Sequence, residues 1–383
     1  MSVAIQRGIV ATAPADSLGY FGWPSVCRLA DGRIAVVASG LRSDHVCPFG
    51  RTVLTFSADD GDSWTSPRVI GDTPLDDRDA GIVELSDGTL VVSWFTMHHG
   101  QRLRQALADS GDRQRTAAYT AAIAAYTDAL LDRWYGSWTR ASEDGGQTWS
   151  GPRRAPITAP HGPIVAPTAH SPNRLLYLGK EFLRGIDGDA EGSGPIAAYS
   201  SEDAGRSWTH LGSVPTCPGT QPEENQEPHV VARGNGVLLG LVRLSALTQE
   251  RLDAEQFINY SMAETYSNDG GSTWSMPSAF PHHGSTPHLM GHSSGRLLAT
   301  FGCREQPYGV GVKSASDSSD DPPAARLRWT LPRTLTDDGI DRDVGYPASV
   351  ELENGDVLTV SYGRIAPGDE KCSLLWARWQ LNE

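Results

Sequence analysis

"SEDGGQTW", residues 142–149, decides the fold prediction, because the same arrangement returns three more times in the sequence. The other copies are "SADDGDSW" from Ser57, "SEDAGRSW" from Ser201 and "SNDGGSTW" from Ser267. In S-x-D-x-G-x-[ST]-W the aspartate can accept backbone N–H bonds that lock a turn, and the glycine permits a positive φ. The tryptophan ring is suited to burial between neighbouring sheets. We interpret the motif as a structural clasp, not as a ligand site.

A second pattern recurs six times beside these turns. Each copy has a small residue or proline, an alternating apolar stretch, a short polar turn and another apolar stretch. Period-2 alternation on both sides of a D-G or N-G turn is a strong hairpin pattern. The six copies are "PSVCRLADGRIAVVA" from Pro24, "AGIVELSDGTLVVSW" from Ala80, "GPIVAPTAHSPNRLLYLG" from Gly162, "PHVVARGNGVLLGLV" from Pro228, "PHLMGHSSGRLLATF" from Pro287 and "PASVELENGDVLTVS" from Pro347.

The spacing of the hairpins predicts an all-β, six-bladed β-propeller that occupies residues 1–383 as one domain. Four of the five intervals are about 60 residues, enough for a four-stranded blade. The longer interval holds an insertion at residues 101–134. Residues 3–10 and 372–381 both resemble strands, and we expect them to pair and close the ring.

The insertion "QRLRQALADSGDRQRTAAYTAAIAAYTDALLDRW" is rich in Ala, Leu and Arg and predicts helix. Tyr119, Ile123, Tyr126 and Leu130 share one helical face. The break at 110–112 predicts two helices. Three roles remain open for them: packing on the propeller rim, a contact in a homo-oligomer, or a lid over the channel.

Composition excludes several classes of function. A net charge of −14 disfavours nucleic acid and anionic membranes as partners. The N-terminus lacks the pattern of a signal peptide, and no apolar stretch is long enough to span a membrane. The five cysteines are scattered without a CxxC, so we expect reduced thiols and a cytoplasmic protein. No ligand spacing supports a metal site at His98 and His99, and no cofactor is expected.

The channel should be lined by residues at two repeated positions, because fold alone does not give function. The first is the residue before each hairpin, where the innermost strand begins: Trp23, Asp79, His161, Glu227, Thr286 and Tyr346. The second is the end of each hairpin's second strand, at the same mouth: Arg42 with Asp44 and His45, then His98, Lys180, Arg243, Arg304 and Arg364. Arginines gathered at one end of an acidic propeller predict an anionic ligand, since the guanidinium fork suits carboxylates.

Four such turns on six repeats resemble the sialidase (neuraminidase) superfamily, over nearly the whole chain apart from the insertion. The resemblance implies that "GYPASVELENG" carries the nucleophile, Tyr346, and that "QEPHVVARGNGVLLGLVR" carries its base, Glu227, and an arginine, Arg243. "FGCRE" offers Arg304 as a further arginine, and "RDAGIVEL" places Asp79 in the sugar pocket. Asp44 is the nearest candidate for the acid/base aspartate. Trp23, Arg42, His45, Arg78 and His161 complete the candidate substrate-binding residues.

The resemblance implies a retaining exo-glycosidase that acts on a terminal acidic sugar. A phenol with a pKa near 10 needs a neighbouring base to act as a nucleophile at neutral pH. Glu227 is the candidate base, and a covalent glycosyl–tyrosine intermediate would give net retention.

One position departs from the family pattern. Sialidases carry an "RIPS"-like motif, whereas this chain has "GWPS", with Gly22 in place of the arginine. Arg42, Arg51 and Arg78 are candidates to replace the missing charge. Three alternatives therefore stay open: a glycosidase for another sugar such as a rhamnoside or arabinoside, a polysaccharide lyase acting on uronates, and a catalytically inactive glycan-binding propeller.

Overall fold

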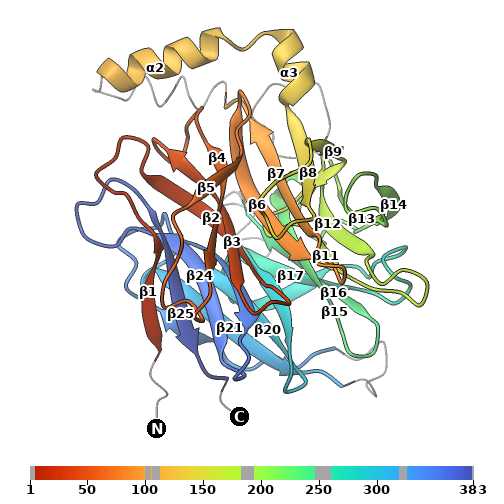
Figure 1. The fold of residues 1–383 in the computed structure, drawn as a ribbon. Coiled ribbons are helices and arrows are strands. Elements are labelled where there is room, and N and C mark those ends of the chain that lie inside the picture. The colour runs from red at the N-terminus through yellow and green to blue at the C-terminus, as the bar shows by residue number, and fades with distance from the viewer. Residues whose placement is uncertain are drawn as a thin grey trace.

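The computed structural model describes residues 5–99, 105, 113–182, 194–245, 260–318 and 326–381. The strands form six antiparallel sheets arranged around a central axis (Figure 1). Within the described residues, no helix is long and apolar enough to cross a membrane.

Four of the six sheets are built from four consecutive strands each. They are β2 (Tyr20–Arg28), β3 (Ile34–Arg42), β4 (Arg51–Ser57) and β5 (Arg68–Gly71); β6 (Asp76–Glu84), β7 (Leu90–Met97), β8 (Gly136–Ser142) and β9 (Arg153–Ala155); β15 (Asn225–Ala232), β16 (Leu238–Leu244), β17 (Ser261–Ser267) and β18 (Ser278–His283); and β19 (His288–His292), β20 (Arg296–Cys303), β21 (Gly309–Ser316) and β22 (Arg333–Thr336).

The third sheet has an interrupted inner edge, where two short strands pair with the same neighbour. Its strands are β10 (Ile157–Thr158), β11 (Ile164–Val165), β12 (Leu175–Glu181), β13 (Ile196–Ser201) and β14 (Thr209–Ser213). A short 3₁₀ turn, Pro222–Glu224, leads from this sheet into β15. The six-bladed propeller predicted from the repeats is confirmed.

The sixth sheet joins the two ends of the chain. It contains β23 (Gly345–Glu351), β24 (Val357–Gly363), β25 (Ser373–Trp379) and, as its outermost strand, β1 (Gln6–Ala11). Gly8 pairs with Trp376 in an antiparallel register. The expected ring closure between the terminal segments is therefore present, and the two ends of the described chain lie close together at one end of the molecule (Figure 1).

A repeated backbone irregularity turns side chains into the channel. In four sheets the pairing between the first two strands skips two residues, and the first skipped residue is Trp23, Asp79, Glu227 or Tyr346. Each of these residues has a positive φ, between 42° and 54°, as does His161 at 69°. Such φ values are unusual for bulky residues, and bulges re-aim side chains at functional sites. Four of the six predicted inner-strand positions thus share one backbone irregularity, and His161 shares its positive φ.

The four aspartate turns connect the third and fourth strands of the first four sheets, at the end opposite to these bulges. In one copy Asp203 accepts hydrogen bonds from Ser201 Oγ at 2.8 Å, Ser207 N at 2.9 Å and Ser207 Oγ at 2.6 Å. Gly205, with φ of 78°, donates its N–H to Ser201 Oγ. These bonds lie within the turn itself, as a clasp requires.

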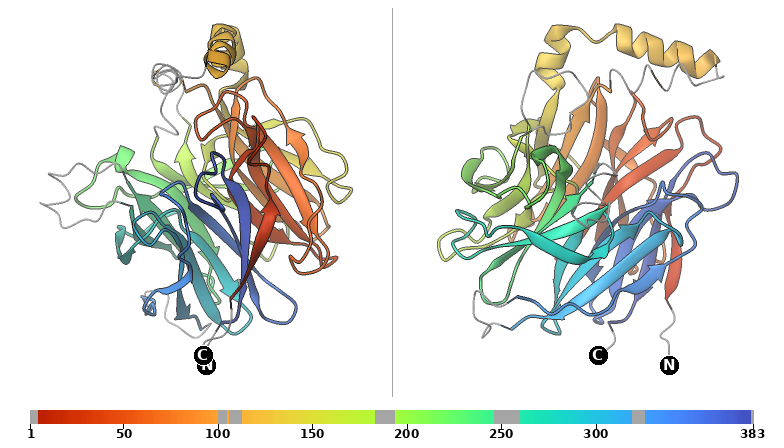
Figure 2. Two further views of the ribbon diagram at one scale, coloured as in Figure 1. Left: turned by 90° about the vertical axis from the view of Figure 1, so that its left-hand side faces the viewer. Right: turned by 180° about the vertical axis from the view of Figure 1, so that it is seen from behind.

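Two helices of the insertion lie at the mouth of the channel where β7 ends and β8 begins (Figures 1 and 2). They are α2 (Arg113–Ala124) and α3 (Asp128–Trp134), and Thr127 caps α3 by accepting a hydrogen bond from Leu130 N at 3.2 Å. The expected break at 110–112 lies outside the described residues, and the interruption that is seen falls at 125–127. The single helical face predicted for 119–130 is therefore divided.

The helices pack on the rim of the first two sheets. Tyr119 of α2 is buried, lies 2.5 Å from Ser43 Oγ, and donates to the carbonyl of Val46 at 3.2 Å. At α3, Arg154 of β9 donates to the carbonyls of Asp132 and Arg133, each at 2.7 Å. Rim packing is thus one role that the insertion fulfils, while its part in an oligomer stays a prediction.

Candidate functional site

A tyrosine, a glutamate and an arginine from two sheets meet in the channel. Tyr346 donates its phenol hydrogen to Glu227 Oε1 at 2.6 Å. Arg243 contacts both partners, with Nη1 3.2 Å from the phenol oxygen and ion-paired to Glu227 Oε2. Thr286 also donates to Oε2. Three inner-strand positions and one second-strand end from the sequence analysis therefore form one hydrogen-bonded unit.

The pKa values of Tyr346 and Glu227 are shifted in opposite directions. Burial, followed by the negative charge of Glu227, raises the pKa of Tyr346 well above 10. Burial also acts to raise the pKa of Glu227, but the guanidinium of Arg243 and the bonds from Thr286 and Tyr346 lower it overall. At neutral pH the phenol is therefore protonated and the carboxylate is ionised and positioned to take its proton.

Trp23 lies between this unit and a buried ion cluster. Its ring centroid is 6.4 Å from that of Tyr346 in an edge-on contact, and the guanidinium carbons of Arg78 and Arg42 lie 4.0 Å and 4.8 Å from it. Both arginines are bonded to Asp76, which is fully buried. The Trp23 ring therefore contacts two guanidinium groups, and both are ion-paired with the buried carboxylate of Asp76.

Arg42 does not contact the channel as a ligand-binding residue, contrary to the expectation. It is fully buried, and its guanidinium binds both carboxylate oxygens of Asp76 and the Ser39 hydroxyl. Arg78 is 5% exposed and donates to the carbonyl of His45 at 2.9 Å. Arg51, the third candidate to replace the missing arginine, is paired with Asp72 at the surface.

A group of arginines surrounds Tyr260, the residue before β17. The guanidinium carbons of Arg243, Arg342 and Arg304 lie 5.3 Å, 5.9 Å and 6.0 Å from its ring centroid. Arg304 also lies 5.4 Å from the Tyr346 ring. Arg342 is exposed and stands in the loop before β23. Three cations therefore gather around Tyr260, and two of them, Arg243 and Arg304, also contact Tyr346. The third, Arg342, was not among the sequence candidates.

Asp79 lines a small cavity with Glu227 and Lys180. It is 3% exposed, and its negative charge is among the causes that raise the pKa of Tyr346. Lys180 is also buried and donates to the carbonyl of Pro222 at 3.0 Å. The structure thus places Asp79 close to the tyrosine unit, and its part in a sugar pocket stays a prediction.

Asp44 and His45 are neighbours in the loop after β3, with different surroundings. The carboxylate of Asp44 binds Arg115 of α2 at 2.5 Å. The imidazole of His45 lies edge-on to Trp23 at 5.0 Å, with Nδ1 2.9 Å from Asp343 Oδ1. His45 therefore lies against Trp23, which contacts the tyrosine unit, whereas Asp44 is bonded to the helical insertion.

Comparison with known families gives one match, to the BNR repeat-like domain, over residues 119–359. The chain belongs to the BNR repeat-like domain family. The match covers more than half of the chain and agrees with the repeats in the sequence. Comparison with curated proteins gives no match.

Solved structures share the fold of this BNR repeat-like protein. A protein of unknown function from Dyadobacter fermentans is 18% identical, with 99% of both chains covered and a TM-score of 0.72. The intramolecular trans-sialidase from Ruminococcus gnavus, in complex with oseltamivir carboxylate, is 14% identical, with 98% of this chain and 97% of that chain covered and a TM-score of 0.64. The NanB sialidase from Streptococcus pneumoniae is 13% identical, with coverage of 98% and 70% and a TM-score of 0.65.

Sequence reasoning missed the acidic residues that support the site of this BNR repeat-like protein. Asp343 accepts hydrogen bonds from Tyr20 at 3.0 Å and Tyr362 at 3.1 Å in addition to its contact with His45. Asp76, as described, holds Arg42. Both acids lie three residues before an inner-strand bulge, and that shared offset is the pattern that could have identified them.

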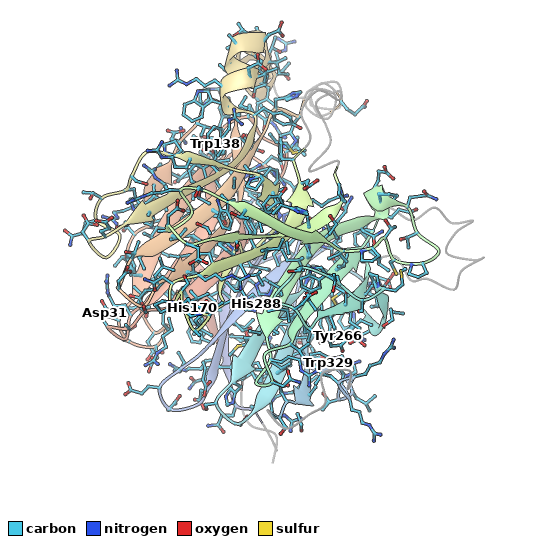
Figure 3. The ribbon with its side chains drawn as sticks, turned by 90° about the vertical axis from the view of Figure 1, so that its right-hand side faces the viewer. Asp31, Trp138, His170, Tyr266, His288 and Trp329 are labelled. Atoms are coloured by element: carbon cyan, nitrogen blue, oxygen red, sulfur yellow. The ribbon has the colours of Figure 1, made fainter. Side chains whose placement is uncertain are left out.

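Three histidines form the next layer of the channel. His161, His229 and His288 lie with ring centroids 4.5–5.6 Å apart, and His288 is near the middle of the molecule (Figure 3). His229 and His288 follow Glu227 and Thr286 by two residues in the sequence. His161, expected to bind substrate, is 5% exposed and lies 2.9 Å from Ser25 Oγ.

The histidine layer predicts a loss of stability in mild acid. Burial lowers the pKa of His161 and His229 well below 6.5 and that of His288 to about 3. The unfolded chain therefore binds more protons below pH 6.5, and the free energy of unfolding falls by up to about 1.4 kcal/mol per pH unit for each histidine. Burial raises the pKa of Asp77 to about 7, which acts in the opposite direction.

Urea denaturation at pH 7, 6 and 5 measures this dependence, and His288→Gln isolates one of the three groups. We expect the unfolding free energy of the variant to change less steeply with pH, by about one bound proton. Parallel pH profiles for the two proteins would show that His288 is not titrating between the folded and unfolded states.

Proposed function

We propose that the protein is a retaining exo-glycoside hydrolase that removes a terminal acidic sugar, such as a sialic acid, with Tyr346 as its nucleophile. The observation that carries the proposal is the 2.6 Å hydrogen bond from the Tyr346 phenol to Glu227, with Arg243 in contact with both. A neutral phenol with an adjacent ionised base is an activated nucleophile that does not repel an anionic substrate.

The chemistry has two steps. In the first, Glu227 takes the phenol proton as the Tyr346 oxygen bonds to the anomeric carbon, and the leaving oxygen departs with a proton from a general acid. In the second, water attacks that carbon and gives a proton to the conjugate base of that acid, the bond to tyrosine breaks, and Glu227 returns its proton to the phenolate. Two displacements at one carbon give retention of configuration.

The acidic sugar is supported by the cations near Tyr260. Arg243, Arg304 and Arg342 offer charge-assisted donors on the side of the channel that holds Tyr346. The similar structures include proteins described as sialidases, one of them in complex with oseltamivir carboxylate. These likenesses show the fold, and the arginines carry the argument about the substrate.

A neutral sugar is the second candidate, and the surroundings of Gly22 favour it. A Cβ built there would lie 3.2 Å from a ring carbon of Tyr20 and 3.5 Å from one of Tyr362. These aromatic rings therefore lie against the position where sialidases have an arginine. A third class, the uronate lyase, would also use the tyrosine, but as the group that moves a proton at C5.

Turnover of 4-methylumbelliferyl glycosides of N-acetylneuraminic acid, L-rhamnose and L-arabinose tests the proposal, with product configuration followed by proton NMR. Release from the sialoside with retention supports it. Release only from a neutral glycoside assigns the site to the second candidate. A uronate polymer that yields an ultraviolet-absorbing product, with no glycoside hydrolysed, would assign it to a lyase.

Arg342→Ala is expected to raise KM for the acidic glycoside by about tenfold with little change in kcat, because it removes one charge-assisted contact with the sugar carboxylate. Initial-rate kinetics on the sialoside measure the change. Arg206→Ala is the control, since Arg206 is an exposed residue of an aspartate turn at the opposite end of the propeller. Equal KM values for both variants would show that Arg342 does not contact the substrate.

A further inference from the structure

The loop after β3 brings an imidazole against the indole of Trp23, which also contacts the nucleophile candidate. His45 Nδ1 lies 2.9 Å from Asp343 Oδ1, and the side chain of His45 is 40% exposed while that of Asp343 is 15% exposed. The Trp23 ring makes edge-on contacts with both His45 and Tyr346. His45 and the phenol therefore flank the same indole.

The hydrogen bonds around Asp343 fix the orientation of the imidazole. An ionised carboxylate only accepts hydrogen bonds, so His45 Nδ1 donates its hydrogen to Asp343 Oδ1. The Tyr20 hydroxyl also donates to this carboxylate, with its oxygen 3.1 and 3.0 Å from the two carboxylate oxygens. The backbone of His45 is also held, because Arg42 and Arg78 each donate to its carbonyl oxygen at 2.9 Å. Nε2 is then the nitrogen that can exchange a proton with a ligand.

Both carboxylate oxygens of Asp44, the acid/base candidate from the resemblance, accept hydrogen bonds from the protein itself. Its Oδ2 accepts from Arg115 Nη2 at 2.5 Å, and its Oδ1 accepts from the backbone N–H of His45 at 2.7 Å. Tyr119 of the same helix contacts Ser43 and Val46. The insertion thus anchors the loop through Asp44, and the adjacent residue faces Trp23.

We infer that His45, positioned by Asp343, is the proton donor to the leaving group, the part that the resemblance gives to Asp44. The inference rests on the proposed hydrolysis. In the first step the bond between the anomeric carbon and the leaving oxygen breaks, and that oxygen takes the Nε2 proton of imidazolium. In the second step neutral His45 takes a proton from the attacking water, which restores imidazolium.

The charges that face His45 come from three other elements. Burial is the main cause that lowers its pKa below 6.5, and Arg78 of β6 and Arg304 after β20 act in the same direction. Asp343, in the loop before β23, favours the charged imidazolium. Because Glu227 must be ionised and His45 protonated, kcat/KM should follow a bell-shaped profile on the acidic side of pH 6.5.

The test compares His45→Gln with Asp44→Asn on two glycosides of N-acetylneuraminic acid, the 4-methylumbelliferyl and the methyl glycoside. A methoxide leaving group needs protonation far more than an umbelliferone does. We expect His45→Gln to lower kcat/KM by at least about a hundredfold for the methyl glycoside and by about tenfold or less for the umbelliferyl glycoside. The variant should also lose the alkaline limb of the pH profile. Asp44→Asn should affect both substrates alike and keep that limb.

Asp343→Asn tests the positioning role, because it keeps the shape of the side chain and removes the charge. The alkaline limb should move to lower pH. The inference is overturned if the loss of kcat/KM depends on the leaving group in Asp44→Asn but not in His45→Gln. The positioning role of Asp343 is overturned if Asp343→Asn leaves the alkaline limb of the pH profile unmoved. Inactivity of the unmodified protein on both glycosides would count against the hydrolase itself. His45→Asn gives a second variant should His45→Gln fail to fold.

Discussion

Tyr346→Phe is expected to lower kcat/KM for the proposed hydrolysis by at least about a thousandfold, because it removes the atom that bonds to the anomeric carbon. The free energy of unfolding should change by only about 1–2 kcal/mol, since Glu227 keeps its bonds to Arg243 and Thr286. Steady-state kinetics and urea denaturation of the same preparation separate the two quantities.

Tyr199→Phe is the matched control for this prediction. Tyr199 donates to Glu181 Oε1 at 2.7 Å, so the variant breaks the same kind of phenol–carboxylate bond on β13, outside the tyrosine unit. It should retain the activity of the unmodified protein. If Tyr346→Phe kept more than about a tenth of the activity, tyrosine would not be the nucleophile.

Asp76→Ala is expected to have the largest effect on stability, a loss of about 3–5 kcal/mol in the free energy of unfolding. Asp76 is fully buried and holds Arg42, which is also fully buried, together with Arg78 and His99. Removing the carboxylate leaves a buried guanidinium without its counter-ion and withdraws support from Trp23. Denaturation in urea at pH 7 measures the loss.

Asp72→Ala provides the contrast, because Asp72 pairs with Arg51 at 3.1 Å while its side chain is 57% exposed. Water screens and replaces such a pair, so a loss below about 1 kcal/mol is expected. Equal losses for the two variants would mean that the buried cluster contributes no more than a surface ion pair.

The fold could be predicted from the sequence because its repeats are local. Each hairpin combines period-2 alternation with a turn of fixed chemistry, and six copies leave few other architectures. The insertion was harder to predict, because its helices are short. The interruption at 125–127 depends on the cap by Thr127 and on packing against Ser43 and Val46, which no helical periodicity encodes.

The site could be predicted only where the repeats define equivalent positions. Tyr346, Glu227 and Asp79 occupy the same place in their hairpins, so their convergence follows from the fold. Among the 46 acidic residues of the chain, Asp343 and Asp76 are marked only by their shared offset, three residues before Tyr346 and Asp79, and that offset gains meaning only once the bulges are known. Arg42 was predicted as a ligand-binding residue but is ion-paired with the buried Asp76. The sequence alone does not distinguish a strand-end arginine that binds a ligand from one that binds a buried carboxylate.

The pairing of β1 with β25 has a consequence for the order of events during synthesis. Residues 6–11 leave the ribosome long before their partner, Ser373–Trp379. Until then the newly made chain carries an unpaired strand, which is a site for contacts with other chains. The last blade therefore cannot be completed before residues 373–379 have been released, and a chain that stops short of residue 373 would leave β1 without its partner.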